Sequence, residues 1–545
     1  MISYFLIFIS LLVILFPKKI SKHDENYIYL LLFASFPISY LILGFISLLF
    51  IHLNISNFPI IYFSILFLLT SLLSNKKIIF KFSTILNFIS SEIKKSFYKN
   101  KNLPFQKTIQ YIIIFITFLI FISSIGPINQ PDASDYHVGY PYQYFIRGGF
   151  FVDGGLHQGL LGIGDYANLS FIQENNIWLI RTLQIINLPI LVLFLSNKIK
   201  NNIFLLGLIS SPTLIQWSTI GKPLFLGESC LIVIYILWKI NKSIFNLKFL
   251  IVLSIACITF KISSLIIVFT ILLDILIYSN TLNSRKVLFN HLSQILRDKL
   301  FIFTFLVLIS LLINREQITG NFAYPLLTNF FNNNEQIVNE FSYFLKNYGR
   351  EGIFPLNIFL PTSFGELGQS LGPFITFTII LSILKIKIKS INHSEKNLLF
   401  ISFSQLIFLL IFAQGRSDYY ICPLILFTYC SRQLSFNKNI QYIKYIFYLS
   451  ILIQLGIIIS FTSVSVLQSI NSLKNFNQTM ERTAFGFSSS LIINKQETNG
   501  VLFTNRNTRL FYPKNYIDRD LFSKCITINN LDKKNDPQNY CLDKY

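Results

Sequence analysis

The stretch that decides the fold runs from Tyr27 to Ile51 and reads YIYLLLFASFPISYLILGFISLLFI, 25 residues without a charged side chain. A helix that crosses a bilayer uses about 20 apolar residues, so this stretch is long enough to span a membrane. A helix is expected because lipid offers no partners to unpaired backbone groups. The whole chain is similar: 52% of its 545 residues are hydrophobic and 13% are charged, with a mean hydropathy of +0.55. This composition excludes a water-soluble globular protein and predicts a polytopic membrane protein.

Further apolar runs bring the expected total to about fourteen spans. They lie at 2–16, 58–74, 108–126, 176–195, 203–220, 224–238, 247–260, 262–278, 300–314, 371–384, 397–413, 419–431 and 445–467. The first run is expected to be retained, because it lacks the basic leading region and small-residue cleavage site of a signal peptide.

We therefore predict an all-α polytopic fold in three parts. Residues 1–107 hold three spans and a basic cytoplasmic loop, and residues 108–467 form a transmembrane core with outer loops at 127–176 and 315–370. Residues 468–545 form an outer tail, in which short apolar strings at 500–504 and 525–528 suggest a small α/β cap without catalytic residues.

Charge alternates between the loops, as the positive-inside rule requires. The net charge is +21, with 46 Lys and Arg against 25 Asp and Glu. Alternate segments hold 27 basic residues and five acids; these segments are 17–26, 75–107, 196–202, 239–248, 279–299, 385–396 and 432–444. The opposite side is acidic, with five acids and two arginines at 127–181. We expect both termini outside a bacterial cytoplasmic membrane, and the basic balance reflects topology rather than nucleic-acid binding.

The six cysteines divide into two sets. Four lie in apolar runs, where a small buried thiol is expected; they are Cys230, Cys257, Cys422 and Cys430. Cys525 and Cys541 lie in the outer tail and would pair as a disulfide in an oxidising compartment. In a reducing compartment they would be two free thiols.

The first outer loop begins where a span ends, and residues 126–137 read GPINQPDASDYH. Asp132, Asp135 and His137 can bind a divalent cation such as Mg²⁺ or Mn²⁺, or deprotonate an acceptor hydroxyl. The alternative is a solvated loop in which Pro131 turns the chain and Asp132 caps a short helix. Composition alone does not choose between the two.

The pattern Asp132-Ala133 and Tyr136-His137, followed by aromatic residues and a Gly-Gly pair, resembles the first outer loop of GT-C glycosyltransferases. These polytopic enzymes take sugars from polyprenyl-phosphate donors. The resemblance implies that Asp132 is the catalytic or metal-linked acid, with Tyr136 and His137 in matching positions. Asp135 occupies a variable place in the family pattern.

Later segments match other elements of the same family in order. They are Gly221-Lys222-Pro223, Phe260-Lys261-Ile262-Ser263, Asn314-Arg315 with residues 319–325 (TGNFAYP), and residues 414–420 (QGRSDYY). Phe322 replaces the usual Pro, and Ser417-Asp418 intrudes between Arg416 and Tyr419. The resemblance covers residues 108 to 434, so the first three spans and the tail lie outside it.

Four cations are expected at the outer face: Lys222, Lys261, Arg315 and Arg416. Charged residues at membrane depth are costly and often line a polar cavity. A lipid-held phosphate needs cationic partners, and Arg offers a bidentate fork whereas Lys offers a point charge. The alternative for each side chain is snorkelling to the headgroups. Asp274, near the inner end of its run, is expected to be a satisfied interfacial acid.

The glycine-rich part of the loop, residues 153–165, lacks the strand-turn-helix context of a nucleotide-binding loop. A cytoplasmic nucleotide-sugar site is therefore not supported. Asp153, His157 and Asp165 either add a second acidic element to the site or are simply polar loop residues.

The sequence thus predicts a glycosyltransferase that moves a sugar from a polyprenyl-phosphate donor to a lipid, glycan or protein acceptor. Asp132 would act as the base or hold a metal, and the four cations would neutralise the phosphate leaving group. Two alternatives are a transporter or lipid flippase, for which no inverted repeat is visible, and a polysaccharide polymerase or ligase with the same donor chemistry.

Overall fold

The structure is a computed structural model and describes most of the chain. The described residues are 1–15, 25–73, 78–99, 104–152, 157–199, 202–278, 282–326, 353–360, 370–386, 393–412, 415–431, 441–484, 487, 502–504, 509–511 and 516–518. The predicted all-α fold is confirmed, because each predicted apolar run forms helix within these residues. The corresponding helices are α1 (Ile2–Leu15), α2 (Glu25–His52), α3 (Ile60–Leu73), α5 (Pro104–Ser123), α9 (Ile180–Gln184), α10 (Leu188–Lys198), α11 (Ile203–Ile209), α12 (Thr213–Ile220), α13 (Leu224–Ile240), α14 (Ile244–Phe260), α15 (Leu265–Tyr278), α17 (Lys299–Thr319), α21 (Pro373–Ile386), α22 (His393–Phe412), α23 (Ile421–Cys430) and α24 (Gln441–Lys474).

The helices have the length and apolar character of a multi-pass membrane protein. Within the described residues, five helical segments are long and apolar enough to cross a membrane, and six if the bent pair α11–α12 forms one span. In two of the five, Lys299–Thr319 and Tyr448–Lys474, only 33% and 28% of the apolar window is buried, so apolar side chains cover the outside of the bundle. The predicted total of about fourteen spans is not confirmed, because several helices are shorter than a full span.

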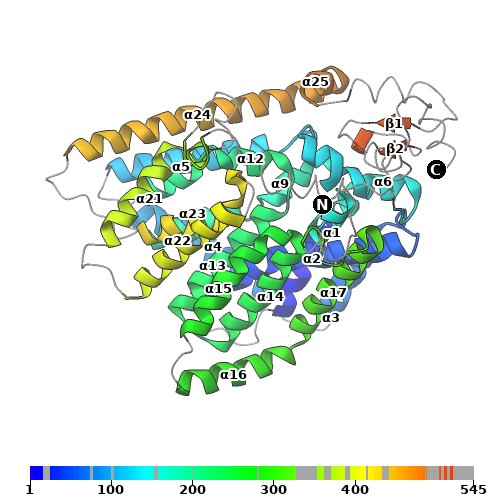
Figure 1. The fold of residues 1–545 in the computed structure, drawn as a ribbon, viewed down its shortest axis with the longest axis horizontal. Coiled ribbons are helices and arrows are strands. Elements are labelled where there is room, and N and C mark those ends of the chain that lie inside the picture. The colour runs from blue at the N-terminus through cyan, green and yellow to red at the C-terminus, as the bar shows by residue number, and fades with distance from the viewer. Residues whose placement is uncertain are drawn as a thin grey trace, which may run out of the picture.

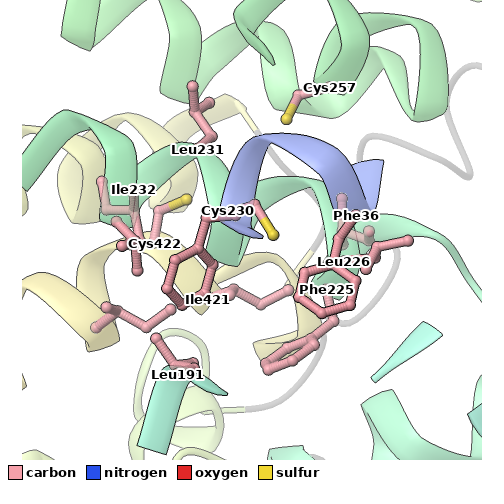
Figure 2. Close-up of a cluster of buried hydrophobic side chains, with 14 of the residues drawn as sticks. Phe36, Leu191, Phe225, Leu226, Cys230, Leu231, Ile232, Cys257, Ile421 and Cys422 are labelled. Atoms are coloured by element: carbon pink, nitrogen blue, oxygen red, sulfur yellow. The ribbon is translucent and has the colours of Figure 1, made fainter. Parts of the chain in front are cut away.

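The centre of the bundle is an apolar core in which α13 packs against α2, α14 and α23 (Figure 1). Figure 2 shows side chains from these helices and from α10 interlocking around Cys230, Cys257 and Cys422. All four cysteines of the apolar runs are buried, as the sequence predicted.

Two basic segments that the sequence analysis treated as loops contain helices, α4 (Ile78–Lys99) and α16 (Leu282–Leu296). In α4 the buried residues Ile85, Phe88, Glu92 and Ser96 recur every three or four positions, which is the spacing of one helix face. Lysine density obscured this pattern, so the helix within the predicted basic loop at 75–107 was not expected.

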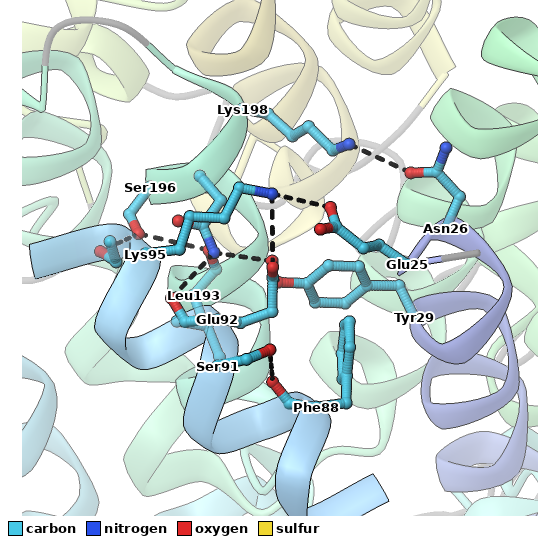
Figure 3. A network of polar contacts seen from close by, with 12 residues as sticks. Glu25, Asn26, Tyr29, Phe88, Ser91, Glu92, Lys95, Leu193, Ser196 and Lys198 are labelled. Atoms are coloured by element: carbon cyan, nitrogen blue, oxygen red, sulfur yellow. Dashed lines mark hydrogen bonds and ion pairs between the residues drawn. The ribbon is translucent and has the colours of Figure 1, made fainter. Parts of the chain in front are cut away.

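Segments predicted to share the basic side of the membrane do meet in space. Glu92 of α4 accepts hydrogen bonds from the Tyr29 hydroxyl (2.7 Å) and the Asn197 amide (2.8 Å), and Lys95 bridges Glu92 and Glu25 (Figure 3). Two further ion pairs lie in these segments or beside them, Lys239–Asp274 and Lys248–Asp298. The Tyr235 hydroxyl also donates to Asp274 at 2.8 Å, so this acid is satisfied as predicted.

The acidic segment forms the opposite end of the bundle. There the carboxylate of Glu174 accepts hydrogen bonds from the backbone N–H groups of Ile2 and Ser3, at 2.8 and 2.9 Å. Short helices fold the rest of this segment; they are η1 (Ala133–His137), α6 (Gly139–Arg147), η2 (Gln158–Leu160), α7 (Ile163–Tyr166), α8 (Asn168–Gln173) and η3 (Ile177–Leu179). The N-terminal start of α1 and the first outer loop therefore share one end, as the charge alternation predicts.

The described tail is small and mixed, as expected. It contains α25 (Phe476–Thr483), η8 (Arg509–Phe511) and two parallel strands, β1 (Leu502–Thr504) and β2 (Tyr516–Asp518). The predicted string at 500–504 supplies β1, whereas 525–528 lies outside the described residues. Two other short elements are η4 (Ile262–Ser264), which precedes α15, and α20 (Leu356–Phe359). In Figure 1 the strands lie at the same end of the molecule as α6.

Replacing Glu92 by Ala should lower the unfolding temperature of the purified protein. Glu92 is 1% exposed, and its loss leaves the Tyr29 hydroxyl without its acceptor, at about 1–3 kcal/mol for an unsatisfied group. The Asn197 amide keeps only its 3.2 Å hydrogen bond to the backbone carbonyl of residue 92. Glu25→Ala is the control, because Glu25 is 45% exposed and a surface pair contributes about 0–1 kcal/mol. Equal shifts in thermal-unfolding midpoint for the two variants would contradict the assignment of Glu92 as the structural member of this network.

Candidate functional site

The first outer loop contains one turn of π-helix, η1, which carries Asp135 and is followed directly by α6. Asp132 precedes this turn and its side chain makes no capping hydrogen bond. The alternative in which Asp132 serves as a helix cap is therefore wrong. Single π-helical turns are uncommon and frequently occur at functional sites.

Asp132 is held between two of the predicted cations. Its Oδ2 atom lies 3.1 Å from Nζ of Lys222 and 3.4 Å from Nη1 of Arg416. The carboxylate is 40% exposed, whereas the lysine and arginine side chains are 7% and 12% exposed. Burial alone would raise the pKa of Asp132, but the two cations outweigh burial and hold this pKa well below its usual range. Asp132 is therefore ionised at neutral pH and remains accessible.

Breaks between helices place the two cations beside Asp132. Lys222 follows Gly221, which closes α12 in the left-handed conformation at φ +72°. Arg416 precedes the short helix η6 (Ser417–Tyr419), whose Ser417 hydroxyl is hydrogen-bonded to the Thr213 hydroxyl of α12. Ser417, one of the two residues that intrude into the family pattern, thus anchors the Arg416 segment to α12.

Lys261 joins this group through an aromatic ring. Its Nζ atom lies 5.4 Å from the centre of the Tyr136 ring, within the range of a cation–π contact. Tyr136 is buried and lies on the π-helical turn, next to His137 in sequence. Lys222, Lys261 and Arg416 therefore surround the same turn, as predicted.

His137 forms a fully buried pair with Asp165. Its Nδ1 atom lies 2.7 Å from Asp165 Oδ1, and the second oxygen of Asp165 accepts the Gly162 N–H at 2.8 Å. The His137 Nε2 atom has no hydrogen-bond partner among the described residues. Burial lowers the pKa of His137 to about 4 despite the neighbouring carboxylate, so the ring is neutral at pH 7, and in this state Nδ1–H donates to Asp165. Asp165 is thus part of the site region rather than a polar loop residue.

Arg315, the fourth predicted cation, is buried on a helix that carries none of the other three. It is 2% exposed on α17. Its Nε atom has no hydrogen-bond partner among the described residues. No contact among the described residues joins Arg315 to Asp132, so the structure does not bring this predicted cation to the carboxylate.

Asp135 has a different set of partners from Asp132. It is 1% exposed and pairs with Nη1 of Arg509, while its Oδ2 atom lies 3.3 Å from Nδ1 of His157. Asp153, the third acid considered in the loop, lies outside the described residues. Arg509 belongs to the tail, where no catalytic residue was expected, and the structure places its side chain against the loop.

The described side chains do not fit a metal at Asp132. In the described parts of the chain, no three His, Cys, Asp or Glu side chains converge as ligands, and the nearest charged partners of Asp132 are cations, which would repel a divalent ion. The Mg²⁺ or Mn²⁺ cofactor stays a prediction. Cys525 and Cys541 lie outside the described residues, so their disulfide also stays a prediction.

No known family model matches this chain, and no curated protein matches its sequence. Among solved structures, it is similar to ArnT from Cupriavidus metallidurans bound to undecaprenyl phosphate. The TM-score is 0.47 at 12% identity, over 77% of this chain and 87% of that one. Similarity at this level assigns no family, and the chain's own residues carry the functional argument.

The buried His137 should make folding stability depend on pH. Its pKa of about 4 in the folded chain lies below the roughly 6.5 of an unfolded histidine, so the unfolded state takes up the proton first as pH falls. Stability is then full above about pH 6.5 and declines towards pH 4. His137→Gln should make the unfolding temperature nearly independent of pH across this window. His291→Gln on α16 is the control, because it removes an imidazole elsewhere in the chain. An unchanged slope in His137→Gln would contradict a buried neutral ring.

Proposed function

We propose that this chain is a GT-C-type glycosyltransferase that moves a sugar from a polyprenyl-phosphate donor to an acceptor hydroxyl at the outer face of a bacterial cytoplasmic membrane. The observation that carries the proposal is the accessible Asp132 carboxylate within ion-pair distance of Lys222 and Arg416. These cations come from separate span ends and converge on an acidic loop. The resemblance of Asp132-Ala133 and Tyr136-His137 to the first outer loop of that family supports the same function.

The proposed reaction is a direct displacement with inversion at the anomeric carbon. The acceptor oxygen forms a bond to this carbon while the bond from carbon to the donor phosphate oxygen breaks. The electron pair of that bond leaves with the polyprenyl phosphate, and the hydroxyl proton passes to Asp132. General-base catalysis of this kind typically contributes about 100-fold or more to the rate.

The ion pairs of Asp132 give the donor phosphate a specific role. A phosphate that binds Lys222 and Arg416 competes with the carboxylate for the same positive charge. Weakening these ion pairs raises the pKa of Asp132 towards its ordinary value, which makes the carboxylate a better base once the donor is bound. The two cations then stabilise the charge that develops on the leaving phosphate.

A transfer assay tests the proposal directly. Purified protein in lipid nanodiscs is incubated with a panel of radiolabelled polyprenyl-phosphate sugars, and released polyprenyl phosphate and labelled products are measured. We expect turnover of at least one donor, by transfer or slow hydrolysis. Folded protein that releases polyprenyl phosphate from none of the donors would count against an enzyme.

The bent pair α11–α12 is the one observation that favours the alternative of a transporter or flippase, because broken helices often form transport sites. The bend is 47°. Transport of labelled lipid across proteoliposomes, without chemical change, would support that alternative. A polymerase or ligase would share the donor chemistry and differ only in its acceptor.

Asp132→Asn should lower turnover at least about 100-fold, because the amide keeps the shape but cannot take the proton. Asp135→Asn should cost at most about 10-fold, since Asp135 is buried in other ion pairs and cannot reach an acceptor. Turnover of both variants at equal amounts of folded protein is the measurement. Near-normal activity of Asp132→Asn together with loss in Asp135→Asn would overturn the assignment of the base.

Lys222→Met should raise the KM for the donor and lower kcat, because one of the two phosphate-binding charges is lost. A hydrogen bond to a charged group contributes about 1.5–3 kcal/mol, or roughly 10- to 100-fold. Lys248→Met is a matched control, since Lys248 is also ion-paired, with Asp298, in the basic segments. If both variants bind and turn over donor like the parent protein, Lys222 has no role in phosphate recognition.

A further inference from the structure

The strongest feature that the proposed reaction does not use is a buried ion pair between the tail and the loop. Arg509 and Asp135 are separated by 374 residues in sequence, and their side chains are 2% and 1% exposed. Removing two charges from water costs several kcal/mol of desolvation free energy, which is offset only where the geometry is good and additional contacts form. A buried pair of this kind therefore indicates that the surrounding structure holds both side chains in place.

Arg509 makes three separate contacts with the loop. Its guanidinium binds Asp135 on η1 and lies 4.6 Å from the centre of the Tyr140 ring on α6. Its backbone carbonyl accepts a hydrogen bond of 2.9 Å from the Gln143 side chain. A single tail residue thus ties the π-helical turn to the helix that follows it.

The fit of the tail against the loop is close. A Cβ atom added at Gly139, the first residue of α6, would clash with the Ser134 carbonyl oxygen of η1 and would lie 2.9 Å from Cβ of Arg509 and 3.2 Å from the Leu510 nitrogen. Any larger residue at this position would clash first with η1 and then with η8. The absence of a side chain at Gly139 therefore permits both the tight turn from η1 into α6 and the docking of Arg509.

The contacts continue from Asp135 to the proposed phosphate site. His157 lies against Asp135, and its ring stacks on Tyr136 with centres 5.3 Å apart and planes inclined by 9°. Tyr136 in turn faces the ammonium group of Lys261. Movement of Asp135 would therefore disturb the same turn that presents Asp132 and His137.

We propose that Arg509 is a positioning residue: the tail docks it on Asp135 to fix the π-helical turn that presents Asp132 to the acceptor. This inference rests on the proposed function for its catalytic consequence, but the docking itself does not depend on it. Arg509 touches no reacting atom. Its loss lowers kcat by misplacing Asp132 and leaves the KM for the donor nearly unchanged, because Lys222 and Arg416 lie outside the pair.

The first test measures the loop itself. Hydrogen exchange of residues 133–147 is followed by mass spectrometry on the full chain in nanodiscs, with no substrate. Arg509→Met should exchange about 10-fold faster in this segment, because the contacts that close it are lost. Arg482→Met, an exposed arginine on α25 of the same tail, is the control and should not change. Unchanged protection in Arg509→Met overturns the proposal.

The second test separates positioning from the penalty of an unpaired buried charge. Arg509→Met leaves Asp135 without its cation, so this variant alone can fail to fold. The double variant Arg509→Met/Asp135→Asn removes both charges and should recover thermal stability while kcat stays about 10-fold low, less than the roughly 100-fold that a 1 Å misplacement can cost. Recovery of full kcat in the double variant overturns the proposal.

Arg509→Lys completes the series, because it keeps the charge but not the planar fork. It should restore part of kcat, with the donor KM unchanged throughout. A higher donor KM with normal kcat would show that Arg509 acts on binding instead and would overturn the positioning role. If the parent protein transfers no sugar, the proposed function fails, whereas the hydrogen-exchange result still decides whether Arg509 fixes the loop.

Discussion

The ion pairs that join Asp132 to Lys222 and Arg416 constrain the whole outer end of the molecule. A charged side chain at membrane depth is tolerated when it is paired or lines a polar cavity, and each of these cations stands at a break between helices. These ion pairs bring three segments together: the loop after α5, the junction between α12 and α13, and the segment before α23. The fold brings the three charges together, and their ion pairs offset the desolvation cost of placing them in an apolar bundle.

Much of this architecture could be predicted from the sequence because the bilayer leaves few choices. Long apolar stretches must satisfy their backbone internally, so run length alone predicts helices such as α2 and α24. Run length does not predict which helices are interrupted, and the predicted run at 203–220 is bent by 47°. Amphipathic helices outside the apolar core, such as α4, were hidden by their lysines although Ile85 and Phe88 share one face.

The site could be predicted only in part. Asp132, Lys222 and Arg416 stand in short local patterns, and these patterns were sufficient to place them together. For Asp165 the local sequence left two alternatives open, and for Arg509 it gave no signal: the first pairs with a histidine 28 residues away and the second with an acid 374 residues away. Contacts between residues so far apart in sequence depend on how the loops pack, which cannot be read from a single sequence.

The two aspartates of the loop show how one turn of backbone can give similar side chains different tasks. Asp132 and Asp135 are three residues apart, yet one carboxylate is 40% exposed and the other 1%. A base must reach its substrate, whereas a group that fixes a backbone turn is most effective where water cannot compete for its partner. The burial of Asp135 with Arg509 therefore complements the accessibility of Asp132: the same turn that presents one acid to the surface places the other in the packed interface with the tail.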